Sequence, residues 1–395
     1  MIQNRNIVCL SNPLWEGDYA KTIVELMSVL AQGNKVLYVD NAYTIKDVLD
    51  GLRGKRSIPF KKVFGLENRI KKIELISKAE VFVLTPPMIL TINFLPRGLL
   101  YNLLLHFNGW LVRRSVKHYL RSLDMEKELV HIVAFNPAMG VTNGRKFNEK
   151  LLLYHCYDEI EAAQWLKKHG DWLEKAFMKM ADATIVTSQG LFERKKALAA
   201  KCYLVKNAVN IDLFIQGFAE AIPVNKRFGY IGSIDDRLDY PLLEELIKNN
   251  PSAEFVFVGR ITDKGGESVL RKYTNVVLTG PKPVHELPGF LQTFSIGIIP
   301  FAKNDFTRGI YPLKINEYLA AGLPVITTNF SYLSEFEAVV RIAENAEEFV
   351  QFSREELATD SIEKKKLRQQ TARSNSWEQR AEELSVIIQQ LEAGQ

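Results

Sequence analysis

The clearest chemical signal in the sequence is a lysine and a glutamate three residues apart at the start of a predicted helix. The stretch from Tyr311 to Thr328 reads YPLKINEYLAAGLPVITT, and the pattern predicts a helix over Lys314–Ala321 that Pro312 introduces. The first turn of a helix exposes N–H groups without intrahelical partners, so it favours an anion. Lys314 adds a positive charge at this end, where it opposes the helix dipole. The lysine is therefore better placed for a phosphate than for helix stability.

Glu317 lies on the same face of this helix as Lys314, because residues three apart on a helix are neighbours. A carboxylate beside a phosphate site can accept hydrogen bonds from the two hydroxyls of a ribose. The alternative is a plain surface ion pair worth a few tenths of a kcal/mol. If the pair binds a ligand, removing both side chains should weaken ligand binding. If it is only a surface ion pair, ligand binding should stay the same.

Three glycine-containing loops follow predicted strands in the same half of the chain. They hold Gly232, Gly259 with Arg260, and Gly280 with Pro281 and Lys282. A glycine at the end of a strand lets the backbone turn and lets a ligand approach closely. Ligands of open α/β sheets bind beyond the carboxyl ends of the strands, where these loops must lie. Each loop alone is weak evidence, because any turn of this kind favours glycine.

In the N-terminal half, the segment LLLYHCYDE brings His155, Asp158 and Glu159 just beyond a buried strand. If the reaction needs a base to take the proton of a substrate hydroxyl, a carboxylate at this edge suits that task. We predict Asp158 as this catalytic residue. The alternative is that Asp158 only caps the helix that follows.

The loop SNPLWEGD follows the first predicted strand and contains Trp15 and Gly17. It is not a G-x-G-x-x-G loop, which argues against a dinucleotide site in this half of the chain. Gly17 is predicted to approach the donor phosphate or the acceptor, with Trp15 beside it in a loop that lines an interdomain cleft. A plain strand-to-helix turn is the equally weighted alternative.

Short apolar runs alternate with helical patterns along the whole chain, which is typical of parallel sheets with crossover helices. The 395 residues are too many for one ordinary core, so we expect two domains. The expected strands are Asn6–Leu10, Lys35–Asp40, Glu80–Thr85, Val130–Phe135, Leu151–Tyr154, Ala183–Thr187, Arg227–Ile231, Glu254–Val258, Asn275–Leu278, Ser295–Ile299 and Pro324–Thr327. The other expected helices are Tyr19–Leu30, Gln164–Met180, Tyr240–Lys248, Val284–Thr293 and Trp377–Leu391.

The segment YPLKINEYLAAGLPVI resembles the donor-binding signature of the GT-B glycosyltransferases, in particular the large retaining group that builds bacterial polysaccharides. ADATIVTS at 181–188, VKNAVNIDLF at 205–214 and SIGIIPF at 295–301 are similar to further motifs of that group. The details most resemble the teichuronic-acid and exopolysaccharide transferases. The resemblance runs from about Ala181 to Thr328. It implies an α/β fold of two Rossmann-like domains, the GT-B arrangement, facing across a cleft.

The same resemblance implies roles for individual residues. Lys314 would hold the diphosphate and Glu317 the ribose, while the remaining predicted donor contacts are Tyr311, Arg260, Arg308, Gly232, Gly280, Pro281 and Lys282. Two positions depart from the family pattern. Gly309 stands where a glutamate usually contacts the donor sugar, and Gly232 is followed by Ser-Ile-Asp-Asp-Arg237 instead of the usual arginine and lysine. Arg237 is the candidate replacement.

We predict an N-terminal acceptor domain over 1–205, a linker over 206–226, a nucleotide-sugar domain over 227–375 and a C-terminal helix over 376–395. Residues 1–200 hold 29 Lys and Arg against 20 Asp and Glu, whereas the remainder holds 22 against 26. This split predicts an anionic partner for the first half. Between Glu80 and Asp124 there are five basic residues, no acid and many aromatic and aliphatic ones.

The uncharged pieces of that segment, 81–96 and 98–112, are shorter than the roughly 18–20 residues that span a bilayer. We therefore expect an interfacial helix on an anionic membrane surface, supported by nine Lys and Arg between Arg53 and Lys78. A core helix with a solvated basic side is the alternative. The start MIQNRNIVCL lacks the plan of a secretory signal, and the expected location is cytoplasmic, at the membrane periphery.

Cys9, Cys156 and Cys202 have no metal-ligand spacing, and no metal or other cofactor is expected. The sequence as a whole predicts a metal-independent glycosyltransferase for cell-surface polysaccharide. The expected partners are a nucleotide-sugar donor, with UDP favoured, and a lipid-linked or glycan acceptor. A nucleotide-sugar epimerase of the same fold and a basic nucleic-acid-binding protein are the alternatives, and the second lacks any recognisable nucleic-acid motif.

Overall fold

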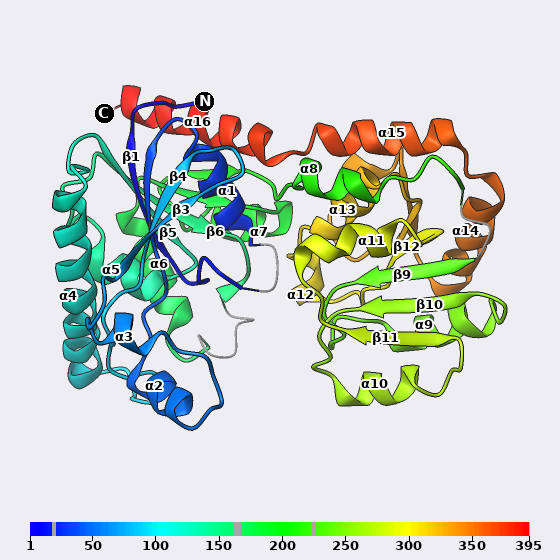
Figure 1. Ribbon diagram of the computed structural model, residues 1–395, viewed down its shortest axis with the longest axis horizontal. Helices are drawn as coiled ribbons and strands as arrows, with labels where there is room; N and C mark the ends of the chain where they lie inside the picture. The colour runs from blue at the N-terminus through cyan, green and yellow to red at the C-terminus, as the bar shows by residue number, and fades with distance from the viewer. Residues whose placement is uncertain (18–20, 161–166, 223–225, 395) are drawn as a thin grey trace. The chain divides into compact units, whose positions relative to one another are not determined.

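The computed structural model describes residues 1–17, 21–160, 167–222 and 226–394 (Figure 1). The chain forms two compact units. Unit 1 contains Met1–Gly17, Lys21–Lys206 and Arg380–Gln395, and unit 2 contains Asn207–Gln379. Each unit is a parallel sheet with helices on its faces. The prediction of two Rossmann-like α/β domains is therefore confirmed.

Unit 1 is built on an eight-stranded sheet with the order β3-β4-β2-β1-β5-β6-β7-β8. All neighbouring pairs are parallel except β3 with β4. The strands are β1 (Asn6–Ser11), β2 (Lys35–Val39), β3 (Ile70–Glu74), β4 (Glu80–Leu84), β5 (Leu129–Ala134), β6 (Leu151–Cys156), β7 (Ala183–Val186) and β8 (Cys202–Leu204). Strands β5 and β6 are buried along their whole length, because helices cover both faces of a parallel sheet.

The helices of unit 1 are α1 (Thr22–Leu30), α2 (Ile45–Leu52), α3 (Phe60–Val63), α4 (Leu99–Ser122), α5 (Pro137–Asn143), α6 (Gly170–Met180) and α7 (Gln189–Lys195). The expected helix starts at Tyr19 and Gln164 fall on residues outside the described ranges. Helix α4 packs on unit 1 through Tyr101, Leu105, Val112 and Val116, among others. Its first half also leaves large apolar side chains exposed, with Leu99 86% and Leu103 61% exposed.

Unit 2 contains a six-stranded parallel sheet with the order β11-β10-β9-β12-β13-β14. Its strands are β9 (Arg227–Ile231), β10 (Glu254–Val258), β11 (Val276–Gly280), β12 (Ile296–Ile299), β13 (Val325–Thr328) and β14 (Val340–Ala343). Its helices are α8 (Ile211–Phe214), η2 (Ile215–Gly217), α9 (Tyr240–Lys248), α10 (Lys264–Leu270), η3 (Val284–Glu286), α11 (Leu287–Leu291), α12 (Asp305–Arg308), α13 (Leu313–Ala320), η4 (Ser334–Phe336), α14 (Ala346–Thr359) and α15 (Ile362–Arg373).

The segment expected to link the domains carries regular structure in its described part. Helix α8 packs against α11 and α13, so Asn207 and the residues after it belong to unit 2. At the other end of the chain, α16 (Trp377–Ala393) begins with Ser376 as its cap, whose hydroxyl accepts a hydrogen bond from Gln379 N. From Arg380 onward the chain belongs to unit 1, where Arg5 pairs with Glu392 at 2.6 Å. From Arg380 onward the last helix thus belongs to unit 1.

No helix within the described ranges is long and apolar enough to cross a membrane. Within the same ranges there is no cluster of three or more His, Cys, Asp or Glu that could hold a metal ion. Cys9 and Cys156 are buried free thiols, and Cys202 is half-buried.

Candidate functional site

The loops after β9, β10 and β11 form one continuous backbone edge in unit 2. Gly232 N donates to Val258 O at 2.8 Å, and Gly259 N donates to Gly280 O at 3.0 Å. A Cβ atom on Gly259 would lie 1.9 Å from the carbonyl oxygen of Gly232, so only glycine fits there. The three predicted glycine loops therefore do meet at the carboxyl edge of the sheet.

Lys314 lies directly against Gly232. A Cβ on Gly232 would be 2.3 Å from Lys314 Cε and 3.0 Å from its Nζ, and the φ angle of Gly232 is +153°. The lysine side chain occupies the space that the missing side chain leaves. The two residues that the sequence predicted for one site, 82 positions apart, are brought into contact.

Helix α13 begins without a side-chain cap. Pro312 is its N-cap residue and makes no side-chain cap, while Ile315 N donates to Pro312 O at 3.1 Å. The N–H groups of Leu313 and Lys314 come before this bond, where an anion site uses the donors of the first turn. Glu317 lies one turn further along the helix and is partly exposed.

The Lys314 ammonium is held between two aromatic rings and near a second cation. Its Nζ lies 5.9 Å from the ring centroid of Tyr230 and 5.7 Å from that of Phe301. Burial lowers the pKa of Lys314 to about 8, helped by the charge of Arg237 and opposed by Glu317 and Asp235. A bound anion would offset the free-energy cost of keeping Lys314 charged, because it places a negative charge next to the ammonium.

Arg237, the candidate replacement for the family's arginine, is paired with Asp235. Its Nε donates to Asp235 Oδ1 at 2.8 Å and its Nη2 to Oδ2 at 2.5 Å. Its guanidinium carbon lies 5.5 Å from the ring centroid of Phe301, the same ring that faces Lys314. Two cations therefore share one aromatic surface beside the Gly232 loop.

The position of α13 depends on Tyr318, a residue that sequence reasoning missed. The hydroxyl of this fully buried tyrosine accepts a hydrogen bond from Ile231 N at 2.8 Å, which ties the helix to the end of β9. Gly297 in β12 makes room for the ring, since a Cβ there would lie 2.4 Å from Tyr318 Cδ2. A glycine inside a strand of isoleucines was the available signal for this close approach.

The other predicted donor residues have more varied surroundings. Arg260 and Pro281 are exposed just after β10 and β11, and Lys282 Nζ lies 6.0 Å from the ring of Phe290. Arg308 ends α12 with an exposed side chain, and its carbonyl accepts from Ser331 Oγ at 3.0 Å.

Tyr311 is the predicted donor residue that lies in the core. Its ring packs near Phe336, and its hydroxyl accepts a hydrogen bond from Asn316 Nδ2 at 3.1 Å. The side chain packs against the first turns of α13 through Asn316. Its contact with a donor stays a prediction.

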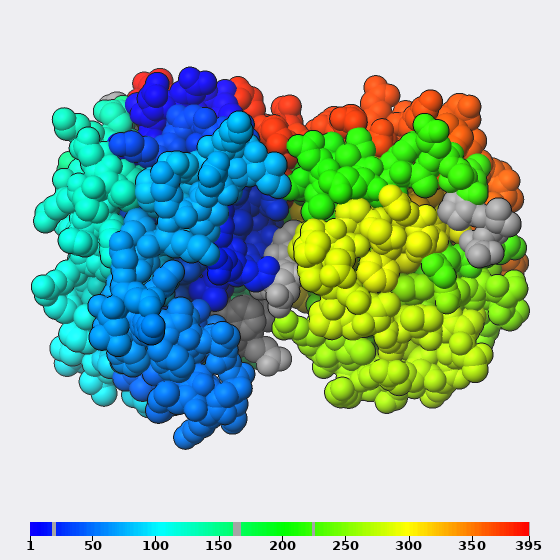
Figure 2. All heavy atoms as spheres, viewed as in Figure 1, coloured from blue at the N-terminus to red at the C-terminus, as the bar shows by residue number. Residues whose placement is uncertain are grey.

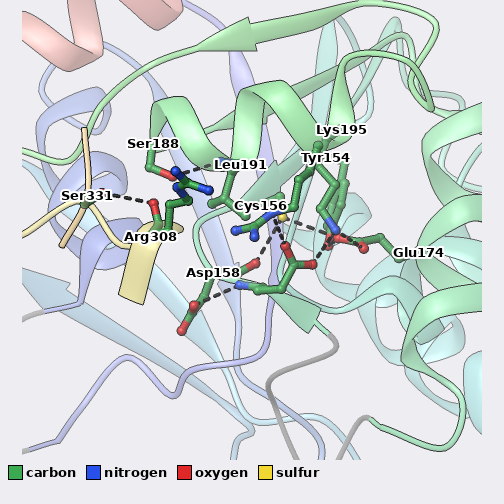
Figure 3. Close-up of polar contacts among 11 residues, drawn as sticks. Tyr154, Cys156, Asp158, Glu174, Ser188, Leu191, Lys195, Arg308 and Ser331 are labelled. Carbon is green, nitrogen blue, oxygen red and sulfur yellow. Dashed lines mark hydrogen bonds and ion pairs between the residues drawn. The ribbon is translucent and has the colours of Figure 1, made fainter. Parts of the chain in front are cut away.

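In unit 1, Asp158 is the exposed member of the three candidates at the end of β6 (Figure 3). His155 lies within β6, which extends to Cys156, and so does not follow the strand as expected. Asp158 Oδ1 accepts a hydrogen bond from Glu159 N at 2.8 Å. His155 is buried, and burial lowers its pKa to about 4, which keeps the ring neutral near pH 7. Glu159 is held in ion pairs. Whether Asp158 also caps the next helix concerns residues 161–166, which lie outside the described ranges.

A buried ion network lies behind the Asp158 loop. Lys195 Nζ donates to Glu159 Oε1 at 2.6 Å and to Glu174 Oε2 at 2.7 Å, while Tyr154 donates to Glu174 Oε1 at 2.8 Å (Figure 3). Burial alone lowers the pKa of Lys195, but the carboxylates of Glu174 and Glu159 outweigh it and raise this pKa above its ordinary value. The network joins α6 and α7 to the loop and fixes Glu159 next to Asp158.

Replacing Lys195 with Met is expected to lower the free energy of unfolding of unit 1 by about 3–5 kcal/mol, because it strands the buried Glu174 carboxylate. Urea unfolding followed by tryptophan fluorescence would measure this, since Trp15, Trp110 and Trp172 all lie in unit 1. The matched control is Lys150→Met, whose partly exposed pair with Glu128 should contribute no more than about 1 kcal/mol. Equal losses in the two variants would contradict a structural role for the network.

The loop with Trp15 and Gly17 wraps the ammonium of Lys21. Lys21 Nζ donates to the carbonyls of Leu14 and Glu16, both at 2.5 Å, and a Cβ on Gly17 would lie 2.7 Å from this nitrogen. Trp15 N donates to Asp40 Oδ1 at 2.7 Å. Asp40, which follows β2, was not predicted from the sequence, and burial raises its pKa to about 6.

Parts of the chain are similar in sequence to known glycosyltransferases. Residues 225–358 match the family model "Glycosyl transferases group 1". The protein TuaH of Bacillus subtilis (strain 168), provisionally assigned as a teichuronic acid biosynthesis glycosyltransferase, is 31% identical over 181 residues. That alignment covers 42% of this chain and 44% of TuaH, so the chain matches less than half the length of this relative.

Several solved structures match nearly the whole chain. The trehalose 6-phosphate synthase of Burkholderia multivorans has a TM-score of 0.63 and 13% identity, covering 99% of this chain and 100% of its own. An E. coli trehalose-6-phosphate structure bound with UDP-2-fluoro glucose also has a TM-score of 0.63, with 10% identity and 98% of both chains covered. At these identities the likeness concerns the fold. Residues 225–358 therefore form a group 1 glycosyltransferase domain, within a chain that has the two-domain GT-B fold.

Proposed function

We propose that the protein transfers a sugar from a UDP-sugar to a lipid-linked or polysaccharide-precursor acceptor in cell-surface polysaccharide synthesis. The observation that carries this proposal is the partly exposed Lys314 side chain, packed against Gly232 at the uncapped start of α13. A cation whose pKa is lowered by its surroundings, beside the opening N–H donors of a helix, favours a bound anion. A diphosphate supplies that anion, and the group 1 domain supplies the enzyme class.

In this proposal the donor lies along the carboxyl edge of the unit 2 sheet. The diphosphate is held by the first turn of α13 and by Lys314, with Arg237 as a second cation and Arg260 and Arg308 as further candidates. Glu317 accepts hydrogen bonds from the ribose hydroxyls. Gly232 permits close approach of the phosphates, while Gly280, Pro281 and Lys282 offer backbone to the base.

Two relatives support the choice of UDP and of the pathway class. The E. coli structure of the same fold is bound with UDP-2-fluoro glucose, and TuaH is assigned to teichuronic acid biosynthesis. Teichuronic acid is a cell-surface polysaccharide, which fits a glycan acceptor for the present chain.

The transfer breaks the bond between the sugar C1 and the diphosphate oxygen and forms a bond from C1 to the acceptor oxygen. We propose that Asp158 takes the proton that the acceptor hydroxyl loses. The negative charge that appears on the departing diphosphate is stabilised by the helix end, Lys314 and Arg237, so the proposed reaction uses no metal. Trp15 and Gly17 are proposed contacts of the acceptor side.

We also propose that unit 1 binds an anionic membrane surface from the cytoplasmic side. Leu99, Leu100, Leu103, Phe107 and Trp110 are exposed on α4, and Leu52, Phe64 and Leu66 are exposed around α2 and α3. In Figure 2 the mid-blue residues of α2 and α3 and the teal residues of α4 lie at the surface of unit 1. Nine basic residues lie between Arg53 and Lys78, the same stretch of sequence as Phe64 and Leu66, and basic with apolar side chains favour anionic lipid.

A thermal-shift panel with UDP, GDP, ADP and dTDP tests the donor part, because a ligand that binds only the folded state raises the unfolding temperature. UDP at 100 times its Kd is expected to add about 2.7 kcal/mol to the stability of unit 2, and the other three nucleotides less. Isomerisation of a UDP-sugar without any acceptor would replace this proposal with an epimerase. Tight, salt-sensitive RNA binding with no nucleotide response would replace it with a nucleic-acid-binding role.

A further inference from the structure

Unit 1 contains two adjoining hollows, of which the smaller has the more polar lining. The first, here the polar pocket, has a volume of about 160 Å³, and the second, the apolar groove, about 640 Å³. They share one wall, formed by Leu90, Thr91 and Ile92. The polar pocket includes Asn12, from the start of the loop with Trp15 and Gly17, and neither hollow includes a residue of the Asp158 loop.

Three asparagines line the polar pocket from three neighbouring strands. Asn12 follows β1, Asn41 follows β2 two residues after its end, and Asn136 follows β5 two residues after its end. The sheet order places β1 between β2 and β5, so the three amides gather at one edge. Asn136 Nδ2 lies 3.4 Å from Asn41 Oδ1. Asn136 Oδ1 also accepts a hydrogen bond from Met139 N at 3.3 Å, so this amide is held in place. The amides of Asn12 and Asn41 can both donate and accept hydrogen bonds, which matches the hydroxyl groups of a sugar.

The polar pocket is better suited to an uncharged group than to an anion. Among its described lining residues there is no lysine or arginine, and burial lowers the pKa of His169, the basic residue it does contain. The carboxylate of Asp47 is already engaged by Thr44 N and Oγ1, both at 2.8 Å, and by Arg56. A cavity of about 150 Å³ in another protein holds a benzene molecule, so this volume admits one six-membered ring.

The apolar groove lies between α2 and the start of α4. Its lining is mostly aliphatic and aromatic, and Leu49, Phe94 and Leu100 are 46%, 70% and 59% exposed. Its volume falls within the roughly 300–1,000 Å³ of ligand pockets. The charged residues that line the groove are Lys46, Arg53 and Asp50, so their net charge is positive.

The shared wall is fixed in position. The buried Asn108 of α4 accepts a hydrogen bond from Leu90 N at 2.9 Å and donates to Leu90 O at 3.0 Å. Lys46 N donates to Thr91 Oγ1 at 3.0 Å, which ties the wall to α2. A rigid wall with an amide-lined hollow on one side and a hydrocarbon-lined groove on the other is suited to a ligand of two halves.

From this pairing we infer that the polar pocket and the apolar groove together bind one amphiphilic acceptor, with a neutral sugar in the pocket and its hydrocarbon chain in the groove. That this ligand is the acceptor rests on the proposed function. To that function the inference adds the residues that select a lipid-linked sugar over a free sugar. The basic rim of the groove matches an anionic linkage between the two halves of such a molecule.

The test uses n-dodecyl β-D-maltoside below its critical micelle concentration, with binding followed by calorimetry on the full chain. Maltose supplies the sugar without the chain, and dodecylphosphocholine the chain without a sugar. The maltoside is expected to bind at least tenfold more tightly than dodecylphosphocholine and at least a hundredfold more tightly than maltose. Equal affinity for the two dodecyl probes would overturn the inference, since it would mean that no sugar is recognised.

Two variants and one control locate the binding. Leu100→Glu puts a charge into the groove and should weaken both dodecyl probes at least tenfold. Leu103→Glu changes an equally exposed leucine of α4 that lines neither hollow, so it should change neither affinity. Asn41→Ala should remove the preference for the maltoside and leave dodecylphosphocholine binding intact.

Equal losses from Leu100→Glu and Leu103→Glu would show a general apolar face and overturn the inference. A maltoside preference that survives Asn41→Ala would do the same. UDP binding to the same samples separates this test from the proposed function, because none of the three probes needs a donor. Loss of UDP binding by the wild-type chain would contradict the glycosyltransferase proposal while the maltoside result still decides the inference.

Discussion

Replacing Lys314 with Met and Glu317 with Gln together is expected to weaken UDP binding by about 10²–10⁴-fold. Hydrogen bonds to charged groups contribute roughly 1.5–3 kcal/mol each, and the double variant removes at least one to the diphosphate and one to the ribose. Both positions are partly exposed on α13, so the variant should still fold. Calorimetric titration with UDP measures the change.

The chain offers a matched control for this variant in the same unit. Lys264 and Glu267 stand three apart at the start of α10, where they form a pair at 3.0 Å with Lys264 85% exposed. Lys264→Met with Glu267→Gln should leave UDP affinity within twofold of the wild type. If both double variants bind UDP like the wild type, Lys314 and Glu317 are only a surface pair.

The pH dependence of UDP affinity gives a second readout for Lys314. Its pKa of about 8 means that the free protein begins to lose this positive charge just above neutral pH. A bound diphosphate favours the protonated form, so affinity should be highest below pH 8 and fall by up to tenfold per unit above it. Lys314→Met should remove this slope, and a slope that persists in the variant would assign it to another group.

The second large effect is expected from Asp158→Asn, which should lower the rate of sugar transfer by about 10²–10⁴-fold. The amide oxygen can still accept the hydrogen bond from Glu159 N, so the loop should keep its shape. UDP affinity should stay unchanged, because the proposed donor contacts all lie in unit 2. The measurement is the transfer rate with a saturating donor.

Asp171→Asn serves as the control for this variant, since it removes another partly exposed carboxylate of unit 1 that pairs with Lys175. Its transfer rate should match that of the wild type. A retaining transferase of the resembled group needs no base at this position. An unchanged rate in Asp158→Asn would therefore remove Asp158 from the mechanism and point to retention.

The central strands of both sheets could be predicted from the sequence because they are buried on both faces and form continuous apolar runs. β3, β8 and β14 were missed for physical reasons. β3 is an antiparallel edge strand that reads IKKIE, and its lysines are exposed, so it looked like part of a basic surface. β8 has three half-buried residues, and β14 interrupts its apolar pattern with the exposed Arg341.

The contact between Lys314 and Gly232 was foreseeable, because both follow strands whose carboxyl ends meet at one edge. The three asparagines of the polar pocket were not. A single asparagine after a strand is an ordinary turn residue, and only the order β2-β1-β5 brings Asn12, Asn41 and Asn136 together. Strand order depends on packing between distant segments, which local patterns do not encode.

A crystal structure of the protein with UDP would show whether the start of α13 is the donor site. The diphosphate is expected within hydrogen-bond distance of Lys314 Nζ and of the first N–H groups of α13, with both ribose hydroxyls on the Glu317 carboxylate. UDP bound away from this helix end, with Lys314 still packed against Gly232 and no phosphate beside it, would show that α13 does not hold the donor.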